Sequence, residues 1–455
     1  MHNKLIKKPK ILVVLPCLWD HQHLTNTLIS EKHEIDFYGE ELFKFPLKIF
    51  NSGYNYSRFL SRLKKYFVDN KYDAIIGTHD YVSCLISSKV SEDLGLPSPP
   101  LKNMLLCQHK YYSRIIQKEV APHAVPSFNQ VGPETSNKEI QEFNLKFPLF
   151  IKPVKATFSL MAHKVESLKE LQKVIRIPFY KQYILKKMLR PMNELFMQYP
   201  EFEIDIYRFI LEDHIEGKQF TIEALVNRHQ VQFINTVDSV MYPNSVHFIG
   251  FVSPSKILKS VQERAQDITR KVIKATGLDN SLFNIEFFYN YKNDELKIIE
   301  INPRICGQFT SIHQMLLGVN TYQVQLDLAT GIKPVLELKK GKFKYAAALA
   351  LRTFEDKVIR RVPSEESLNR IYTRYSDCSI NIFGQLGRRL SSEPQDEGSF
   401  VYALVNIGAQ SEMELYKKFD EIRKLIDFEF EFESEKKLDQ HINFKLNTLD
   451  KESNV

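Results

Sequence analysis

The stretch SLFNIEFFYNYKNDELKIIEINPRICGQ, residues 281–308, decides the fold, because it sets two carboxylates, an amide and an arginine among apolar residues. Side chains alternate between the two faces of a β-strand, so Glu300, Asn302 and Arg304 share one face of IIEINPR. The residues just before Glu300 are apolar on both faces, which predicts a strand in the interior of a sheet. A charge in that position needs a partner.

A second strand-like run, residues 283–289, carries Glu286. The midpoint between Glu286 and Glu300 falls at Asn293, inside Tyr-Lys-Asn-Asp, whose residue types favour a turn. A hairpin about this turn sets the two glutamates opposite each other, which charge repulsion and desolvation both oppose. A divalent cation removes the conflict. Two carboxylates and the Asn302 carbonyl oxygen suit Mg²⁺, with Mn²⁺ as the alternative ion. The other interpretation is a pair of acids neutralised by nearby lysine or arginine.

These two strands resemble the metal-binding motif of the ATP-grasp superfamily, in which an E...EINPR strand pair holds Mg²⁺ and ATP. The resemblance implies that Glu286, Glu300 and Asn302 bind the metal. It also implies two catalytic residues: Arg304, which meets charge on the transferred phosphoryl group, and Lys152, which meets the nucleotide phosphates. Lys152 lies in KFPLFIKPVK, which is similar to the strand that carries this lysine in the family.

The remaining nucleotide contacts also follow from the resemblance. Lys110 stands in the context of a second phosphate-binding lysine. FILEDHIEGKQFTIEALV is similar to the segment whose backbone, here at Glu212 and Ile215, hydrogen-bonds the adenine edge. Gln219 replaces a glutamate that holds the ribose hydroxyls, and it accepts a hydrogen bond without charge. The phosphate loop, residues 155–161, contains no glycine, although glycine is what lets backbone amides approach phosphates.

Length and alternation of elements predict a multidomain α/β and α+β protein. Residues 1–105 alternate short apolar strands with longer segments, as in an open parallel α/β domain, which the resemblance identifies as a pre-ATP-grasp domain. Residues 106–335 are expected to form a two-lobed ATP-grasp domain with an insertion near 175–200. Residues 336–440 resemble the strand-strand-helix domain that ends carboxylate-amine ligases. Residues 441–455 are expected to form a flexible polar tail.

Composition excludes several classes of function. The net charge of +7 is small for 455 residues and is spread along the chain, so we expect no binding to nucleic acid. Lysines followed by an apolar run in residues 1–19 mimic a secretion signal, but no small-residue cleavage site follows. No run approaches the roughly 20 apolar residues of a membrane span. Five cysteines without a C-x-x-C pair favour a reducing compartment, and we predict a cytoplasmic protein.

Four further features each have two interpretations. Residues 78–80, Thr-His-Asp, follow a predicted strand and either line the substrate site or cap the next helix. His247 is either a substrate contact or a structural residue. Arg388 and Arg389 are candidates for gripping a carboxylate, although adjacent residues of a strand point in different directions. Cys306, beside the metal strand, is expected to pack rather than react.

The resemblance implies a reaction in two steps. The γ-phosphoryl group of ATP passes to a carboxylate, and an amine then displaces phosphate from the acylphosphate. Positioning and charge neutralisation dominate phosphoryl transfer, which suits a site of lysines, metal ligands and an arginine. We predict an ATP-dependent carboxylate-amine ligase for an amino acid or similar small acid, with small-molecule carboxylate and amine substrates and a homodimer as one possible assembly.

Two other functions stay open at this point. Biotin carboxylases share the ATP site, but after the arginine they continue with glutamate and histidine where this chain has CGQFT, residues 306–310. A bicarbonate-activating enzyme is therefore the second hypothesis. The third is a nucleotide-binding protein with little turnover, which the glycine-free loop and Gln219 motivate.

Overall fold

The structure is a computed structural model that describes residues 7–40, 55–80, 82–155, 161–176, 179–243, 245, 247–338, 341–392 and 398–431. The predicted tail, 441–455, and most of the predicted phosphate loop lie outside these residues. In the part of the chain that is described, no helix is long and apolar enough to cross a lipid bilayer.

Three parallel strands form the N-terminal sheet in the order β2-β1-β3, which confirms the predicted open parallel domain. Parallel strands need long crossover connections, and helical segments supply them here. The strands are β1 Lys10–Val14, β2 Glu34–Tyr38 and β3 Ala74–Ile76, and the helices around them are α1 Leu18–Leu24, α2 Thr27–Ser30, α4 Tyr56–Asp69 and α5 Ser83–Leu94.

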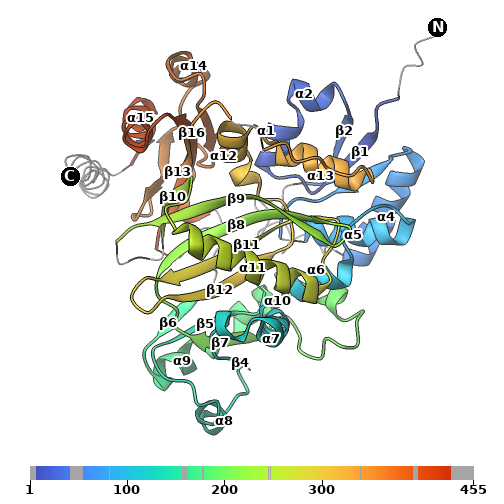
Figure 1. Ribbon diagram of the computed structural model, residues 1–455, viewed down its shortest axis with the longest axis vertical. Coiled ribbons are helices and arrows are strands. Elements are labelled where there is room, and N and C mark those ends of the chain that lie inside the picture. The colour runs from blue at the N-terminus through green and yellow to red at the C-terminus, as the bar shows by residue number, and fades with distance from the viewer. Residues whose placement is uncertain are drawn as a thin grey trace.

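A small antiparallel sheet follows in the order β4-β7-β5-β6 and lies at the lower end of the molecule in Figure 1. The connecting elements are α6 Leu101–Gln108, α7 Lys110–Val120 and the 3₁₀ helix η2 Pro122–Ala124. The strands are β4 Phe128–Val131, β5 Leu149–Pro153, β6 His163–Val165 and β7 Phe209–Asp213, and the accompanying helices are α8 Asn137–Glu142, α9 Leu168–Ile175 and α10 Phe179–Phe196. The segment predicted as an insertion contains α10.

An eight-stranded sheet crosses the middle of the molecule in the order β12-β11-β8-β9-β10-β13-β16-β15 (Figure 1). Its strands are β8 Lys218–Asn227, β9 Gln230–Met241, β10 Phe248–Ser253, β11 Ser281–Asn290, β12 Glu295–Asn302, β13 Tyr345–Thr353, β15 Ser379–Ile382 and β16 Phe400–Ala409. The later elements are α11 Lys259–Thr276, α12 Gly307–Leu317, α13 Thr321–Ala329, α14 Glu365–Arg374, η3 Leu390–Ser392, α15 Glu412–Leu425 and the paired strands β14 Ile359–Arg361 and β17 Glu429–Phe430. Because β10 and β13 pair directly, the sheet is continuous across the predicted boundary at 335, and the domain limits stay a proposal.

Strand β12 lies at an edge of this sheet as the structure describes it, which corrects the predicted interior strand. Because of the register shift after Glu286, its buried apolar residues Leu296, Ile298 and Ile301 share one face, opposite Glu300, and α6, α7 and η2 pack against the strand. Ile298 and Ile301 are both buried there. A covered edge strand and an interior strand carry the same apolar pattern, so the pattern alone does not separate them.

Helix α15, which ends the described strand-strand-helix region, has Ser411 as its N-cap. Ser411 Oγ accepts a hydrogen bond from the backbone N–H of Glu414 (3.2 Å), and Glu414 Oε2 accepts one from the N–H of Gln410 (2.8 Å). The apolar face of the helix buries Phe419, whereas Leu425 at its end is 41% exposed. The helix thus covers the C-terminal strands with its first three turns.

A fully buried carboxylate ties the N-terminal domain to the rest of the chain. Asp20 accepts hydrogen bonds from the backbone N–H of Cys17 (2.7 Å), from Thr78 Oγ1 (2.8 Å) and from Tyr322 Oη (2.8 Å). Tyr322 belongs to α13, which packs against β3. One side chain therefore joins two loops of the parallel sheet to a helix that lies between β12 and β13 in sequence.

We expect Asp20→Ala to lower the free energy of unfolding by about 3 kcal/mol or more, because it leaves three buried donors without an acceptor. Asp69→Ala is the control, since Asp69 is exposed and pairs with Lys65 in an i,i+4 contact worth less than about 1 kcal/mol. Urea unfolding of the two variants measures the difference. Equal losses in both would contradict the proposed role of Asp20.

Candidate active site

The two glutamates face each other across β11 and β12, as the sequence predicts. Glu286 pairs with Glu300 in the antiparallel register, and the turn covers residues 291–294. The register shifts immediately after this pair, so Phe287 lies opposite Ile298. Ile299 is therefore the extra residue of a β-bulge directly beside the carboxylates.

Two amides contact Glu286. Gln219 Nε2 donates to Glu286 Oε2 (2.8 Å), and Asn302 Nδ2 donates to Glu286 Oε1 (3.2 Å). These donors are neutral, and burial together with the neighbouring Glu300 raises the pKa of Glu286 to about 8. Gln219, expected at the ribose, thus lies against a predicted metal ligand, and its ribose contact stays a prediction.

Glu300 has cationic neighbours instead. Its Oε2 lies 3.1 Å from Lys110 Nζ. Burial would raise the pKa of Glu300, but Lys110 and Lys152 outweigh burial and lower that pKa to about 2. Neutralisation by lysine, which was the alternative to a metal ion, accounts for Glu300 and leaves the conflict at Glu286.

The donor set around this pair fits Mg²⁺. Asn302 Nδ2 also donates to Asn284 Oδ1 (3.0 Å), which leaves the amide oxygen of Asn302 as its ligand atom. The protein thus offers two carboxylates and one amide oxygen, all hard oxygen donors. Among the described residues, no three His, Cys, Asp or Glu side chains form a complete metal site. A bound Mg²⁺ would take its other ligands from water and phosphate oxygens, which are its usual partners.

Three lysines, Lys110, Lys152 and Lys155, lie near this pair. Lys152 Nζ lies 2.9 Å from Glu212 Oε2, and burial lowers the pKa of Lys152. Burial also lowers the pKa of Lys155, which the sequence did not single out as a site residue. The backbone N–H of Lys110 donates to Val154 O (2.9 Å), so the start of α7 is joined to the end of β5. The structure brings the two predicted phosphate lysines together.

The side chain of Glu212 lies between Lys152 and Arg114. Arg114 Nε is 2.5 Å from Glu212 Oε1. Burial would raise the pKa of Glu212, but Arg114 and Lys152 outweigh it and bring the pKa to about 2. Glu212 lies inside β7, and Ile215 lies in the link between β7 and β8, so their backbone contacts to adenine stay predictions. Sequence reasoning missed Arg114, although it follows Lys110 by four residues, one helical turn.

Arg304 is paired with a residue of the N-terminal domain. Its Nε donates to Asp80 Oδ2 (2.7 Å), and its Nη2 lies 2.5 Å from the same atom. Burial would raise the pKa of Asp80, but Arg304 and Lys155 lower it. Residues 78–80 do not cap α5, which corrects that interpretation. The N-cap is Val82 with no side-chain bond, and Ser83 Oγ accepts from the N–H groups of residues 78 and 79.

A third glutamate of the large sheet, Glu223, was missed. It lies on β8 directly opposite Asn284 of β11, and Asn284 lies opposite Asn302 of β12, so the three form one row beside the row of Glu286 and Glu300. Glu223 is 3% exposed, and burial raises its pKa to about 8. The alternation of Gln219, residue 221 and Glu223 along β8 would have placed it on the same face.

The remaining candidates lie in structural contacts. His247 Nδ1 is 2.9 Å from Ser399 Oγ, and a substrate contact for it stays a prediction. Arg388 and Arg389 lie after β15 in a turn and an isolated bridge, not in a strand, which corrects their expected geometry. Arg389 lies 3.6 Å from Asp356. Cys306 immediately precedes α12, and burial raises the pKa of its thiol, in line with the expected packing role.

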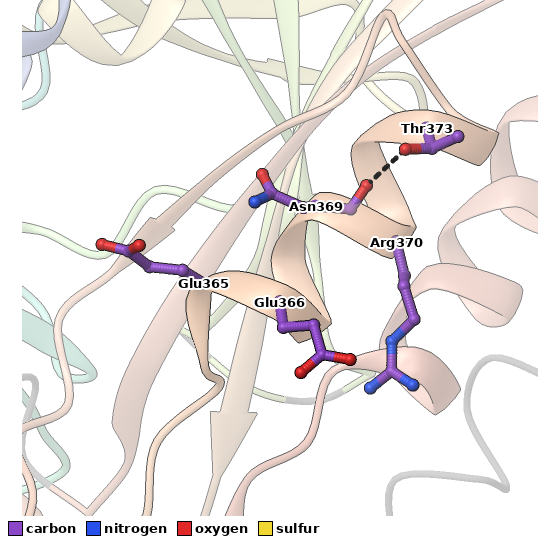
Figure 2. A pocket seen from close by; sticks show the side chains of 5 residues that line it. All are labelled: Glu365, Glu366, Asn369, Arg370 and Thr373. Carbon is purple, nitrogen blue, oxygen red and sulfur yellow. Dashed lines mark hydrogen bonds between the residues drawn. The ribbon is translucent and has the colours of Figure 1, made fainter.

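A surface hollow lies along α14 and contains no predicted site residue. Figure 2 shows its lining, which comes from this single helix, with Thr373 Oγ1 donating to Asn369 O (2.8 Å). Glu366 in this hollow is exposed and serves as a matched control for the glutamates of the site.

Comparison with known proteins identifies the fold. Residues 145–312 match the family model of the ATP-grasp domain. The crystal structure of L-amino acid ligase from Bacillus licheniformis is similar, at 15% identity and a TM-score of 0.66, covering 94% of this chain and 99% of that one. Biotin carboxylase from Campylobacter jejuni, solved as a β,γ-ATP complex, is 13% identical with a TM-score of 0.64 and covers 92% of each chain. Phosphoribosylglycinamide synthetase from Anaerococcus prevotii is 15% identical with a TM-score of 0.60, covering 93% of this chain and 100% of that one.

The matched domain and the similar structures define an ATP-grasp fold. Residues 145–312 form an ATP-grasp domain, as the resemblance of the hairpin indicates.

The raised pKa of Glu223 predicts that the free energy of unfolding depends on pH. Its unfolded pKa is about 4.3, and its folded pKa is about 8, so between these values only the folded state holds the proton. Its stabilising contribution is complete below pH ~4.3 and is lost as the pH rises through about 8. Relative to Glu223→Gln, the wild type should lose about 1 kcal/mol per pH unit across this window. Urea unfolding at pH 6 and pH 8 measures it, with Glu366→Gln expected to follow the wild type. Parallel wild-type and Glu223→Gln curves would refute the assignment.

Proposed function

We propose that this protein is an ATP-dependent carboxylate-amine ligase that forms an amide or peptide bond on an amino acid or similar small carboxylic acid. The observation that carries the proposal is the facing pair Glu286 and Glu300, with Lys110 and Lys152 converging on the same space. Phosphoryl transfer needs such a combination of metal ligands and fixed cations, because its catalysis consists mainly of positioning and charge neutralisation.

In the proposed reaction, an oxygen of the substrate carboxylate attacks the γ-phosphorus of ATP, the bond between that phosphorus and the bridging oxygen breaks, and ADP leaves. The amine nitrogen then attacks the acyl carbon, phosphate leaves with the carbon–oxygen bond electrons, and the nitrogen loses a proton. Bound Mg²⁺ would neutralise phosphate charge and orient the phosphates.

The chain's own residues take distinct parts in this scheme. Lys110 and Lys152 hold phosphate oxygens, and Arg304 meets the charge on the transferred phosphoryl group. Asp80 keeps the Arg304 guanidinium in one orientation through contacts to both Nε and Nη2. The Mg²⁺ ligands are Glu286, Glu300 and Asn302, with Mn²⁺ as the alternative ion.

Support for an amino acid as substrate comes from two sources. The L-amino acid ligase of Bacillus licheniformis shares the fold over nearly the whole chain. Residues 306–310, CGQFT, also depart from the glutamate-and-histidine continuation of biotin carboxylases.

A cytoplasmic location is proposed on the five cysteines, all of which are free thiols. A homodimer is the proposed assembly.

Glu300→Gln should lower Mg²⁺-ATP turnover at least a hundredfold, which corresponds to about 3 kcal/mol of lost transition-state stabilisation, and should leave the fold intact. The amide keeps the size of the side chain and removes its charge. ADP release, with circular dichroism as the check on folding, measures both effects, and Glu366→Gln is the matched control. Full activity in folded Glu300→Gln would refute the metal assignment.

A substrate panel separates the candidate reactions. ADP and phosphate release from Mg²⁺-ATP is measured with amino acids supplied singly and in pairs, and with bicarbonate alone. We expect release that depends on particular pairs, since the amine completes the cycle. Release with bicarbonate alone would replace the ligase with a bicarbonate-activating enzyme, and tight ATP binding without release under any condition would favour a protein with little turnover.

A further inference from the structure

Arg114 is the largest side chain in the described residues that is fully buried. It lies on α7, one turn after Lys110, so both cations project from the same face of the helix. Lys110 contacts Glu300 of the large sheet, and Arg114 reaches deeper, toward the small sheet. A buried arginine is costly unless every N–H group finds an acceptor.

Each part of the guanidinium has a partner. Its Nε donates to Glu212 Oε1 (2.5 Å), its Nη1 to Gln117 Oε1 (2.6 Å) and its Nη2 to Ile299 O (2.9 Å). Gln117 is itself held by a donation from its Nε2 to Ser113 Oγ (2.8 Å). The arginine therefore has a fixed geometry set by α7, the small sheet and the large sheet together.

Ile299 is the extra residue of the β-bulge beside the glutamate pair, so its carbonyl is available to accept hydrogen bonds from side chains outside the sheet. Lys152 Nζ also approaches this carbonyl (3.5 Å) while it pairs with Glu212 Oε2 (2.9 Å). Arg114 and Lys152 thus share the same two acceptors. One carboxylate, Glu212, is placed between two cations.

This sharing sets the charge that Lys152 offers to a ligand. Arg114, Glu212 and Lys152 together carry one net positive charge. Without Arg114 the negative charge of Glu212 would cancel that of Lys152, and the group would be neutral. The side chains of Arg114 and Glu212 are each only 2% exposed, so solvent screens these charges weakly.

We propose that Arg114 is a positioning residue which neutralises Glu212 and thereby keeps the charge of Lys152 available to the phosphates of the nucleotide. The inference rests on the proposed function, in which Lys152 binds phosphate. Arg114 itself does not contact the nucleotide in this scheme. Its hydrogen bond to Ile299 also holds the strand that carries Glu300 at a fixed distance from Lys152.

The test measures equilibrium binding of Mg²⁺-ATP and of adenosine by calorimetry. Arg114→Met should weaken Mg²⁺-ATP binding at least about tenfold and leave adenosine binding unchanged, because only phosphates sense the lost charge. Adding Glu212→Gln to Arg114→Met removes the uncompensated carboxylate, and the double variant should recover Mg²⁺-ATP affinity to within about threefold of the wild type. Arg374→Met is the control, because Arg374 forms an exposed pair with Glu421.

A double variant that binds Mg²⁺-ATP no better than Arg114→Met, or a parallel loss of adenosine binding, would overturn the proposal. If Arg114→Met does not fold, the single variant Glu212→Gln serves as the test. It changes the side chain and leaves in place the backbone that is predicted to contact adenine. Tighter Mg²⁺-ATP binding in Glu212→Gln supports the charge argument, and weaker binding overturns it. A wild type that binds no Mg²⁺-ATP would instead defeat the proposed function.

Discussion

The repulsion between Glu286 and Glu300 is the constraint on which the arrangement of the site depends. Strand alternation and the hairpin register place the two half-buried carboxylates side by side, where water screens their repulsion incompletely. Positive charge must come from elsewhere in the chain. Lys110 lies on α7 and Lys152 lies on β5 of the small sheet. Their attraction to the carboxylates of the hairpin therefore helps to hold α7 and the small sheet against the large sheet.

The same hairpin also fixes the N-terminal domain. Arg304 continues the strand that carries Glu300 and pairs with Asp80, which follows β3 of the parallel sheet. Close by in sequence, Thr78 donates to the buried Asp20, and Asp20 accepts from Tyr322 of α13. Two polar contacts of different kinds therefore join the carboxyl ends of the parallel strands to the region of the β11–β12 hairpin. Ligands of open α/β sheets bind at this edge of the strands.

Local rules were sufficient for part of this site. The hairpin turn and the facing glutamates follow from the period of two in a strand and from turn residues, which act over a few positions. The edge position of β12 was not predictable, because an edge strand covered by α6, α7 and η2 carries apolar residues as an interior strand does. Arg114 and Asp80 find their partners 98 and 224 residues away, and no local pattern encodes such distances. The same alternation of strand residues that predicted the position of Glu286 could also have predicted that of Glu223.

The charge of the whole cluster explains why it suits a polyphosphate. Among the described residues, its cations outnumber the acids that ionise most readily, since burial keeps the pKa of both Glu223 and Glu286 near 8. The cations are Lys110, Arg114, Lys152, Lys155 and Arg304, and the acids with depressed pKa values are Asp80, Glu212 and Glu300. A site with excess positive charge in a buried setting favours an anion strongly. A divalent cation bound at Glu286 would replace its proton, so nucleotide and metal each improve the fit of the other.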